Sequence, residues 1–177
     1  KIGSSTASIN EIIEYESSLK KSTSDKHIKS IYEISVLSEE LKARGKKIVF
    51  TNGCFDIVHT GHIKYLETSK SYGDILVVGL NSDKSVSSLK GIERPFNSEK
   101  DRAYNIAALE SVDYVVIFKE EDPYNLIKSI KPHILTKGAD YKDKKVIGHD
   151  LVEELKLIDF VDDKSTSKLV NKIKSSK

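Results

Sequence analysis

Residues 47–67 read KIVFTNGCFDIVHTGHIKYLE, and this stretch decides how the rest of the chain is organised. The apolar run Ile48-Val49-Phe50 has the β-branched and aromatic content of a buried parallel strand, and Asn52-Gly53 is a turn signal that ends it. After a short loop, apolar residues recur at helical spacing until Gly73. The segment therefore predicts a strand, a glycine turn and a helix in immediate succession.

Two histidines, His59 and His62, lie in this loop with Gly61 between them. The N-terminus of a helix presents unpaired N–H groups and the positive end of the helix dipole, which together bind anions. Imidazoles beside such a point suggest a phosphate whose charge changes during a reaction. A metal site with Cys54 as a third ligand is the alternative, but zinc sites need three or four ligands at recognised spacings, and neither CxxC nor HExxH is present. We therefore predict no metal held by side chains.

The remaining chain alternates strands and helices. Further strands are expected at residues 74–80, 114–118, 134–136 and 157–161. Helices are expected at residues 26–44 (capped by Ser24), from residue 97 or 98 to about 111, and at residues 165–173. Two more helices are expected to begin at residues 81–83 and at residues 122–123. This alternation predicts an α/β fold with a doubly wound, parallel, five-stranded sheet. Ligands of such sheets bind at the carboxyl ends of the strands, so the ends of the first and fourth strands should face the site.

Composition restricts the class of protein. The 29 basic and 27 acidic residues nearly balance, which argues against a general nucleic-acid surface, and no apolar run approaches the length of a membrane span. A single cysteine permits no intrachain disulfide and fits a reducing cytoplasm. The chain begins with Lys and contains no methionine, so we expect it to be part of a longer chain or a processed product.

Arginine is scarce, with Arg44, Arg94 and Arg102 as its only instances. A guanidinium group binds phosphate in a bidentate manner that lysine cannot reproduce, so Arg94 and Arg102, which lie close together in a polar segment, are candidate phosphate ligands. The alternative is a pair of surface ion pairs with the neighbouring Glu93 and Asp101.

The motif Gly53-Cys54-Phe55-Asp56, followed by His59-Thr60-Gly61-His62, resembles the HxGH signature of the cytidylyltransferase-like nucleotidyltransferases. Three later segments, NSDKSVSSLKGIERPFNSEKDR, TKGADY (136–141) and Ser165-Thr166-Ser167, resemble further motifs of one branch of that superfamily, the heptose 1-phosphate adenylyltransferases. The resemblance implies a Rossmann-like nucleotidyltransferase fold. Asp56 is expected to brace the loop by hydrogen bonding rather than to act in catalysis.

By position, the resemblance implies three groups of site residues. The catalytic group is His59, His62, Lys90 and Thr166; the nucleotide- or phosphate-binding group is Asn52, Gly53, Cys54, Phe55, Gly61, Lys137, Gly138, Asp140, Tyr141, Ser165 and Ser167; the sugar-phosphate-binding group is Lys90, Arg94 and Arg102. Lys90 read without the resemblance is an ordinary exposed loop lysine.

The implied reaction moves AMP from ATP to D-glycero-β-D-manno-heptose 1-phosphate, giving ADP-heptose and pyrophosphate for lipopolysaccharide core synthesis. Magnesium would be bound through the ATP phosphates. Two alternatives stay open: a cytidylyltransferase acting on glycerol 3-phosphate or another small phosphate, and a non-catalytic nucleotide-binding module.

The opening KIGSSTASINEI resembles the end of a ribokinase-like sugar kinase domain. Residues 1–22 are therefore expected to be a kinase tail plus linker, and residues 23–177 the nucleotidyltransferase domain. The resemblance further implies a homo-oligomer whose partners are ATP, heptose 1-phosphate and the preceding kinase domain. The composition described above predicts a cytoplasmic protein that binds neither nucleic acid nor membrane.

Overall fold

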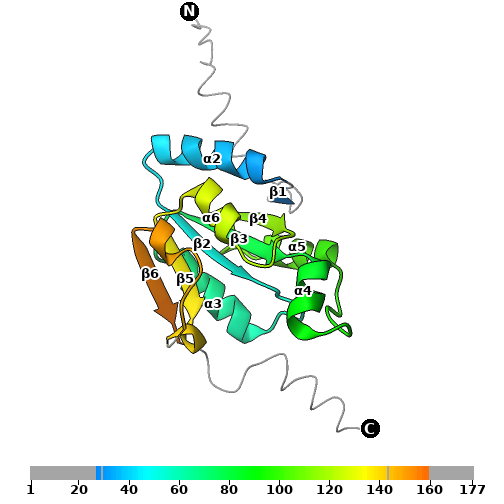
Figure 1. Ribbon diagram of the computed structural model, residues 1–177. Helices are drawn as coiled ribbons and strands as arrows, with labels where there is room; N and C mark the ends of the chain where they lie inside the picture. The colour runs from blue at the N-terminus through cyan, green and yellow to red at the C-terminus, as the bar shows by residue number, and fades with distance from the viewer. Residues whose placement is uncertain (1–26, 29, 143, 160–177) are drawn as a thin grey trace, which may run out of the picture.

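The computed structural model describes residues 27–28, 30–142 and 144–159. Its strands are β1 (His27–Ile28), β2 (Ile48–Gly53), β3 (Ile75–Asn81), β4 (Tyr114–Phe118), β5 (Ile134–Gly138) and β6 (Glu154–Ile158). Its helices are α2 (Ile31–Ala43), α3 (Thr60–Lys70), α4 (Asp83–Lys90), α5 (Glu99–Ala107) and α6 (Tyr124–Ile130), with short 3-10 helices η2 (Ala139–Tyr141) and η3 (His149–Leu151). These segments alternate along the chain as the sequence predicts (Figure 1).

One parallel sheet joins the strands in the order β1-β4-β3-β2-β5-β6. Five of these strands, β4-β3-β2-β5-β6, form the predicted doubly wound sheet, and the two-residue β1 adds an edge strand that was not predicted. The strand order reverses between β3 and β5 on the two sides of β2, which pairs with both. The carboxyl ends of β2 and β5 therefore meet at the switch point where such folds bind ligands.

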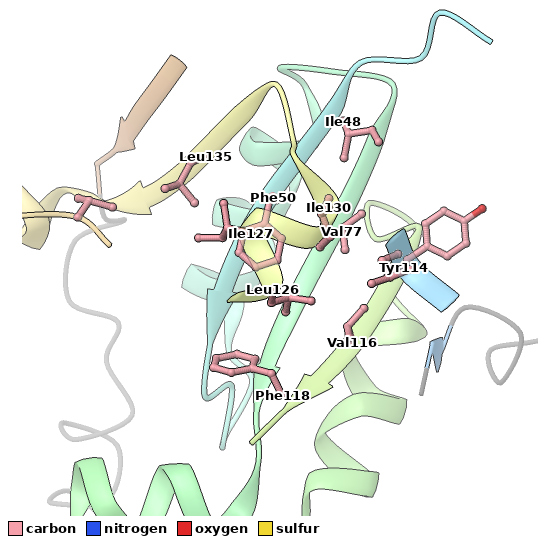
Figure 2. Packing of buried hydrophobic residues seen from close by; sticks show 12 residues of the cluster. Ile48, Phe50, Val77, Tyr114, Val116, Phe118, Leu126, Ile127, Ile130 and Leu135 are labelled. Carbon is pink, nitrogen blue, oxygen red and sulfur yellow. The ribbon is translucent and has the colours of Figure 1, made fainter. Parts of the chain in front are cut away.

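Successive side chains of β2 enter opposite layers of the core. Ile48 and Phe50 pack with residues of α2 and α6 in one cluster, whereas Val49 packs with residues of α3 and α5 in the other. Figure 2 shows the first cluster, in which side chains of α6 lie over β2, β3 and β4. Both faces of the sheet are covered, which explains why its strands are continuous apolar runs rather than alternating ones.

Three predicted boundaries were wrong. The first helix starts at Ile31 and is capped by Ser30 in a capping box with Glu33, because residues 27–28 pair with β4 as a strand instead of opening the helix. The helix expected to reach residue 111 ends at Ala107, where the chain turns so that Val112 is buried ahead of β4. The last strand is Glu154–Ile158 rather than residues 157–161.

Some predictions concern residues that the structure does not describe. The kinase tail at residues 1–22 and the helix at residues 165–173 lie outside the described ranges, so they stay predictions, whereas Ser30 takes the capping role predicted for Ser24. Within the described ranges, no helix has the length and apolar character that crossing a membrane requires.

Candidate active site

The N-terminus of α3 is positioned by the loop that follows β2. His59 is the N-cap residue of α3, and its Nδ1 atom accepts a hydrogen bond from the Gly61 N–H at 3.1 Å. An Nδ1 atom that accepts carries no proton, so the neutral ring has its proton on Nε2 and can donate from there. The cap thus gives His59 one orientation and one tautomer.

His62 stacks on His59, with ring centroids 3.9 Å apart and an interplanar angle of 27°. Burial, with smaller contributions from the neighbouring His59 and Lys90 charges, lowers the pKa of His62 from 6.5 to about 4. The ring is therefore neutral at neutral pH. Its Nδ1 atom is buried and has no hydrogen-bond partner among the described residues, so a ligand oxygen would satisfy a group that the protein leaves unpaired.

Phe55 holds the turn before the histidines in an uncommon conformation. Its φ is +45°, in the left-handed region that costs a residue with a side chain about 1 kcal/mol or more. The residue is 6% exposed, and its ring makes a T-shaped contact with the His62 ring, with the two centroids 5.3 Å apart. A Cβ atom at Gly53 would lie only 3.0 Å from the Phe55 ring, which explains the glycine at the end of β2.

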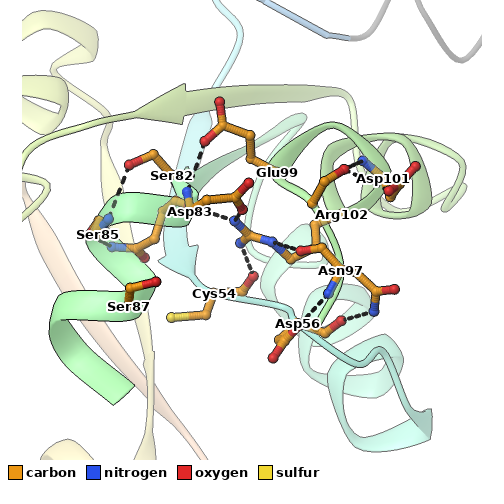
Figure 3. A network of polar contacts seen from close by, with 12 residues as sticks. Cys54, Asp56, Ser82, Asp83, Ser85, Ser87, Asn97, Glu99, Asp101 and Arg102 are labelled. Carbon is orange, nitrogen blue, oxygen red and sulfur yellow. Dashed lines mark hydrogen bonds and ion pairs between the residues drawn. The ribbon is translucent and has the colours of Figure 1, made fainter. Parts of the chain in front are cut away.

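Asp56 braces this loop, which confirms the role predicted for it. Its carboxylate accepts hydrogen bonds from Arg94 Nη1 at 2.5 Å, from the Phe96 N–H at 2.8 Å and from the Asn97 N–H at 3.0 Å. The Asp56 backbone carbonyl accepts another from the Asn97 side chain at 2.5 Å (Figure 3). Arg94 therefore pairs with Asp56 and not with the neighbouring Glu93, and its guanidinium also lies over the Phe96 ring, 4.2 Å from the centroid.

Lys137 lies at the end of β5, where its Nζ donates to the Asn52 side-chain oxygen at the end of β2 over 2.5 Å. The lysine is 7% exposed, and burial lowers its pKa from 10.5 to about 8, against the raising effect of Asp140 and Cys54. Its ammonium group is 5.1 Å from the centroid of the Tyr141 ring. A poorly hydrated cation at this edge is ready to bind an anion.

Lys90, the last residue of α4, is exposed. Its charge lowers the pKa of His62 and opposes the increase that burial causes in the pKa of the Cys54 thiol. Lys90 thus acts electrostatically on two residues of the histidine loop, and its predicted contact with phosphate stays a prediction.

Arg102 does not lie where a phosphate ligand would. Its side chain is wholly buried, and four N–H groups donate to protein atoms: to the carbonyls of Asn97 at 3.0 Å, Cys54 at 2.5 Å and Asn81 at 2.8 Å, and to the Asp83 carboxylate at 2.8 Å (Figure 3). A guanidinium has five N–H groups, so these four hydrogen bonds to protein atoms leave one N–H group for any other partner. The predicted contact of Arg102 with a sugar phosphate is therefore wrong for this arrangement, and so is its alternative, a surface pair with Asp101.

The other predicted site residues fall into two groups. Gly138, at the end of β5, and Asp140 and Tyr141, in η2, follow Lys137 at the same sheet edge, with Asp140 exposed. Ser165, Thr166 and Ser167 lie outside the described residues, and their roles stay predictions.

A buried hydroxyl network beneath the site was not predicted. The Tyr65 hydroxyl lies 2.7 Å from Thr51 Oγ1 and 3.3 Å from Thr136 Oγ1, and Ser69 Oγ lies 2.9 Å from Thr136 Oγ1. It links α3 to β2 and β5, and burial raises the pKa of Tyr65. The only signal in the sequence is the i, i+4 spacing of Tyr65 and Ser69 on one helix face.

The groups at this edge suit a phosphate rather than a metal ion. Among the described residues, no cluster of three or more His, Cys, Asp or Glu side chains could hold a metal. Imidazole N–H groups, ammonium groups and a helix N-terminus instead form a preorganised set of donors for negative charge.

Comparisons with known proteins show the family to which the chain belongs. Residues 50–177 match the model of the family described as cytidylyltransferase-like. The chain is 60% identical over 176 residues to the "Bifunctional protein HldE" of Aliarcobacter butzleri. The matched region is 99% of this chain but only 37% of that protein. The chain thus spans little more than a third of the length of the curated relatives it matches.

Two solved structures resemble the fold. A lipopolysaccharide core biosynthesis protein from Thermoplasma volcanium is 31% identical, with a TM-score of 0.52, over 66% of this chain and 98% of the other. A pantoate-beta-alanine ligase from Francisella tularensis matches with a TM-score of 0.59 over 80% of this chain and 68% of the ligase chain. Because the two sequences are only 17% identical, this match supports the fold alone. With its HxGH loop at the switch point of a doubly wound sheet, the chain belongs to the cytidylyltransferase-like family.

Proposed function

We propose that this chain is an adenylyltransferase that converts ATP and D-glycero-β-D-manno-heptose 1-phosphate into ADP-heptose and pyrophosphate. An oxygen of the sugar phosphate attacks the α-phosphorus of ATP and forms a new P–O bond. The bond between the α-phosphorus and the oxygen bridging to the β-phosphate breaks, and the electron pair leaves with pyrophosphate. The attacking group is already an anion, so no side-chain nucleophile is required.

The observation that carries the proposal is the pair of stacked imidazoles at the N-terminus of α3, at the same sheet edge as Lys137. Such a pair can donate hydrogen bonds to phosphate oxygens as charge builds in the transition state. The choice of the heptose branch is supported by the 60% identity to an HldE protein across almost the whole chain.

Each group then has a defined task in this mechanism. His59 and His62 contact the reacting phosphate, Lys137 and Lys90 offset the charge of the triphosphate and of the sugar phosphate, and Thr166 binds a flanking phosphate. Positioning and charge stabilisation together supply the catalysis, as in phosphoryl transfer generally. Magnesium would arrive with ATP and neutralise phosphate charge.

The wider role of the chain is also a proposal. The word "Bifunctional" in the name of the HldE relatives, and the 37% of the A. butzleri protein that the chain spans, support a longer protein with a second activity. The resemblance of KIGSSTASINEI to the end of a sugar kinase supports a kinase that precedes this part. The name of the T. volcanium protein supports a role in lipopolysaccharide core synthesis. Cytoplasmic location and homo-oligomeric assembly stay predictions.

Pyrophosphate release with magnesium tests the proposal when ATP and CTP are each offered with heptose 1-phosphate and with glycerol 3-phosphate. Release only with ATP and heptose 1-phosphate is expected. Release only with CTP would keep the fold and mechanism but overturn the substrate. Tight nucleotide binding with no release from any pair would favour a non-catalytic module.

The low pKa of Lys137 predicts a basic limb in the pH profile. Above about pH 8 the buried ammonium group loses its proton, and its attraction for the triphosphate is lost. We expect kcat/KM for ATP, which reports the free enzyme, to fall as pH rises through about 8. Lys137→Arg stays charged throughout this range and should remove the limb.

Lys142→Arg, at an exposed position just after η2, is the matched control and should keep the wild-type profile. A basic limb that is unchanged in Lys137→Arg would exclude Lys137 as its source.

A further inference from the structure

The least expected feature of the site is the wholly buried Arg102, whose guanidinium joins three separate segments through four acceptors (Figure 3). We propose that Arg102 is a positioning residue that holds the Cys54–Phe55 peptide, and through it the histidine loop, in the reactive conformation. It thereby acts on the transferred phosphate through the loop and makes no contact with substrate.

The contact with Cys54 fixes the orientation of one peptide unit. Arg102 Nη1 donates to the Cys54 carbonyl oxygen at 2.5 Å. Because a trans peptide is planar, its N–H and C=O point in opposite directions, so the Phe55 N–H is directed away from Arg102. This peptide immediately precedes the left-handed Phe55, whose ring packs against His62. Strained backbone of this kind persists only where its surroundings hold it.

The other contacts connect the same guanidinium to the start of α4. Arg102 Nη2 donates to the carbonyl of Asn81, at the end of β3, and to the carboxylate of Asp83, the first residue of α4. The last residue of that helix is Lys90, whose charge acts on His62. One side chain therefore sets the loop that carries the histidines against the helix that carries the lysine.

Lysine cannot replace this geometry. Arg102 directs four N–H groups from one plane to acceptors in different segments, whereas an ammonium group has three donors around a single atom. Arg102→Lys keeps the positive charge but should leave at least one of the carbonyls unsatisfied. Its effect thus separates positioning from charge.

The sole thiol of the chain provides a readout that needs no substrate. Cys54 is half-buried, and its own carbonyl is the one that Arg102 binds. We expect Arg102→Lys to increase the rate of Cys54 modification by a chromogenic disulfide reagent roughly tenfold, since losing a buried hydrogen bond of this kind favours local opening. Arg44→Lys, which changes an exposed arginine after α2, should react like the wild type.

Steady-state kinetics provide the second readout, which rests on the proposed function. Arg102→Lys should lower kcat by about 10²-fold while KM for each substrate changes by less than about threefold, because misplaced catalytic groups affect the transition state and not ground-state binding. A raised KM for the sugar phosphate at unchanged kcat would instead identify Arg102 as a direct ligand and overturn the proposal. So would wild-type values of both kcat and Cys54 reactivity.

Asp83→Asn keeps the test decisive if Arg102→Lys fails to fold, since it weakens one half-exposed contact of Arg102. It should increase Cys54 reactivity in the same direction and to a smaller extent, and an unchanged rate would count against the proposal. If the wild type transfers no nucleotide at all, the proposed function fails, but the thiol rates still decide the role of Arg102.

Discussion

His62→Ala is expected to lower kcat by about 10²–10³-fold, which is the scale of removing one preorganised donor from a site of developing negative charge. The ring is held on two sides, by the stacked His59 and by a T-shaped contact with the Phe55 ring, so its one N–H group cannot turn away from a bound phosphate without losing these contacts. Its pKa of about 4 keeps it neutral at neutral pH, so it acts there as a hydrogen-bond donor and not as a fixed cation.

Turnover of purified protein with saturating ATP and sugar phosphate measures the effect. His149→Ala is the control, because His149 is exposed in η3 and its ring contacts the nearby Val146 carbonyl and Asp150 carboxylate. The control should keep kcat within about twofold of the wild type, in line with the small effects of surface substitutions. Wild-type turnover in His62→Ala would show that the ring does not contact the reacting phosphate.

Asp56→Ala is expected to destabilise the fold by about 3 kcal/mol or more, because removing one partner of a buried ion pair leaves the other without compensation. The Asp56 side chain is 1% exposed and that of Arg94 14% exposed. The substitution also leaves the Phe96 and Asn97 N–H groups without their carboxylate acceptor. The single substitution therefore removes the ion pair with Arg94 and two backbone hydrogen bonds at once.

Urea unfolding followed by circular dichroism measures this free energy. Glu93→Ala removes an exposed acid from the connection between α4 and α5, which supplies the partners of Asp56, and should change stability by less than about 0.5 kcal/mol. An Asp56→Ala variant as stable as the Glu93→Ala control would mean that the brace contributes little, and that the loop is held mainly by Arg102 and the Phe55 ring.

The parts of the structure that depend on residues close to one another in sequence could be predicted. The β2-loop-α3 unit depends on a short apolar run, a turn and a helical pattern, all of which are local. The bracing role of Asp56 was confirmed, but its partners lie far away in the chain and were not predicted. The meeting of β2 and β5 followed from the general rule for doubly wound sheets rather than from any single residue.

Long-range partners explain what sequence reasoning missed. The charge of Arg102 indicated a phosphate ligand, because nothing local shows that its acceptors come from the ends of β2 and β3 and from the loop before α5. The first helix was misplaced because β1 depends on pairing with β4, which is distant in the chain. The hydroxyl network escaped notice for the same reason, since Thr51 and Thr136 meet only in the folded sheet.

The most direct test of the central claim follows the α-phosphorus of ATP. The chain is incubated with magnesium, α-³²P-labelled ATP and heptose 1-phosphate, and the labelled products are separated by chromatography. Transfer predicts that the label enters a sugar nucleotide that contains adenine and heptose, in step with pyrophosphate release and only when the sugar phosphate is present. Label that stays in ATP, or that appears in AMP or ADP whether or not the sugar phosphate is added, would contradict the account.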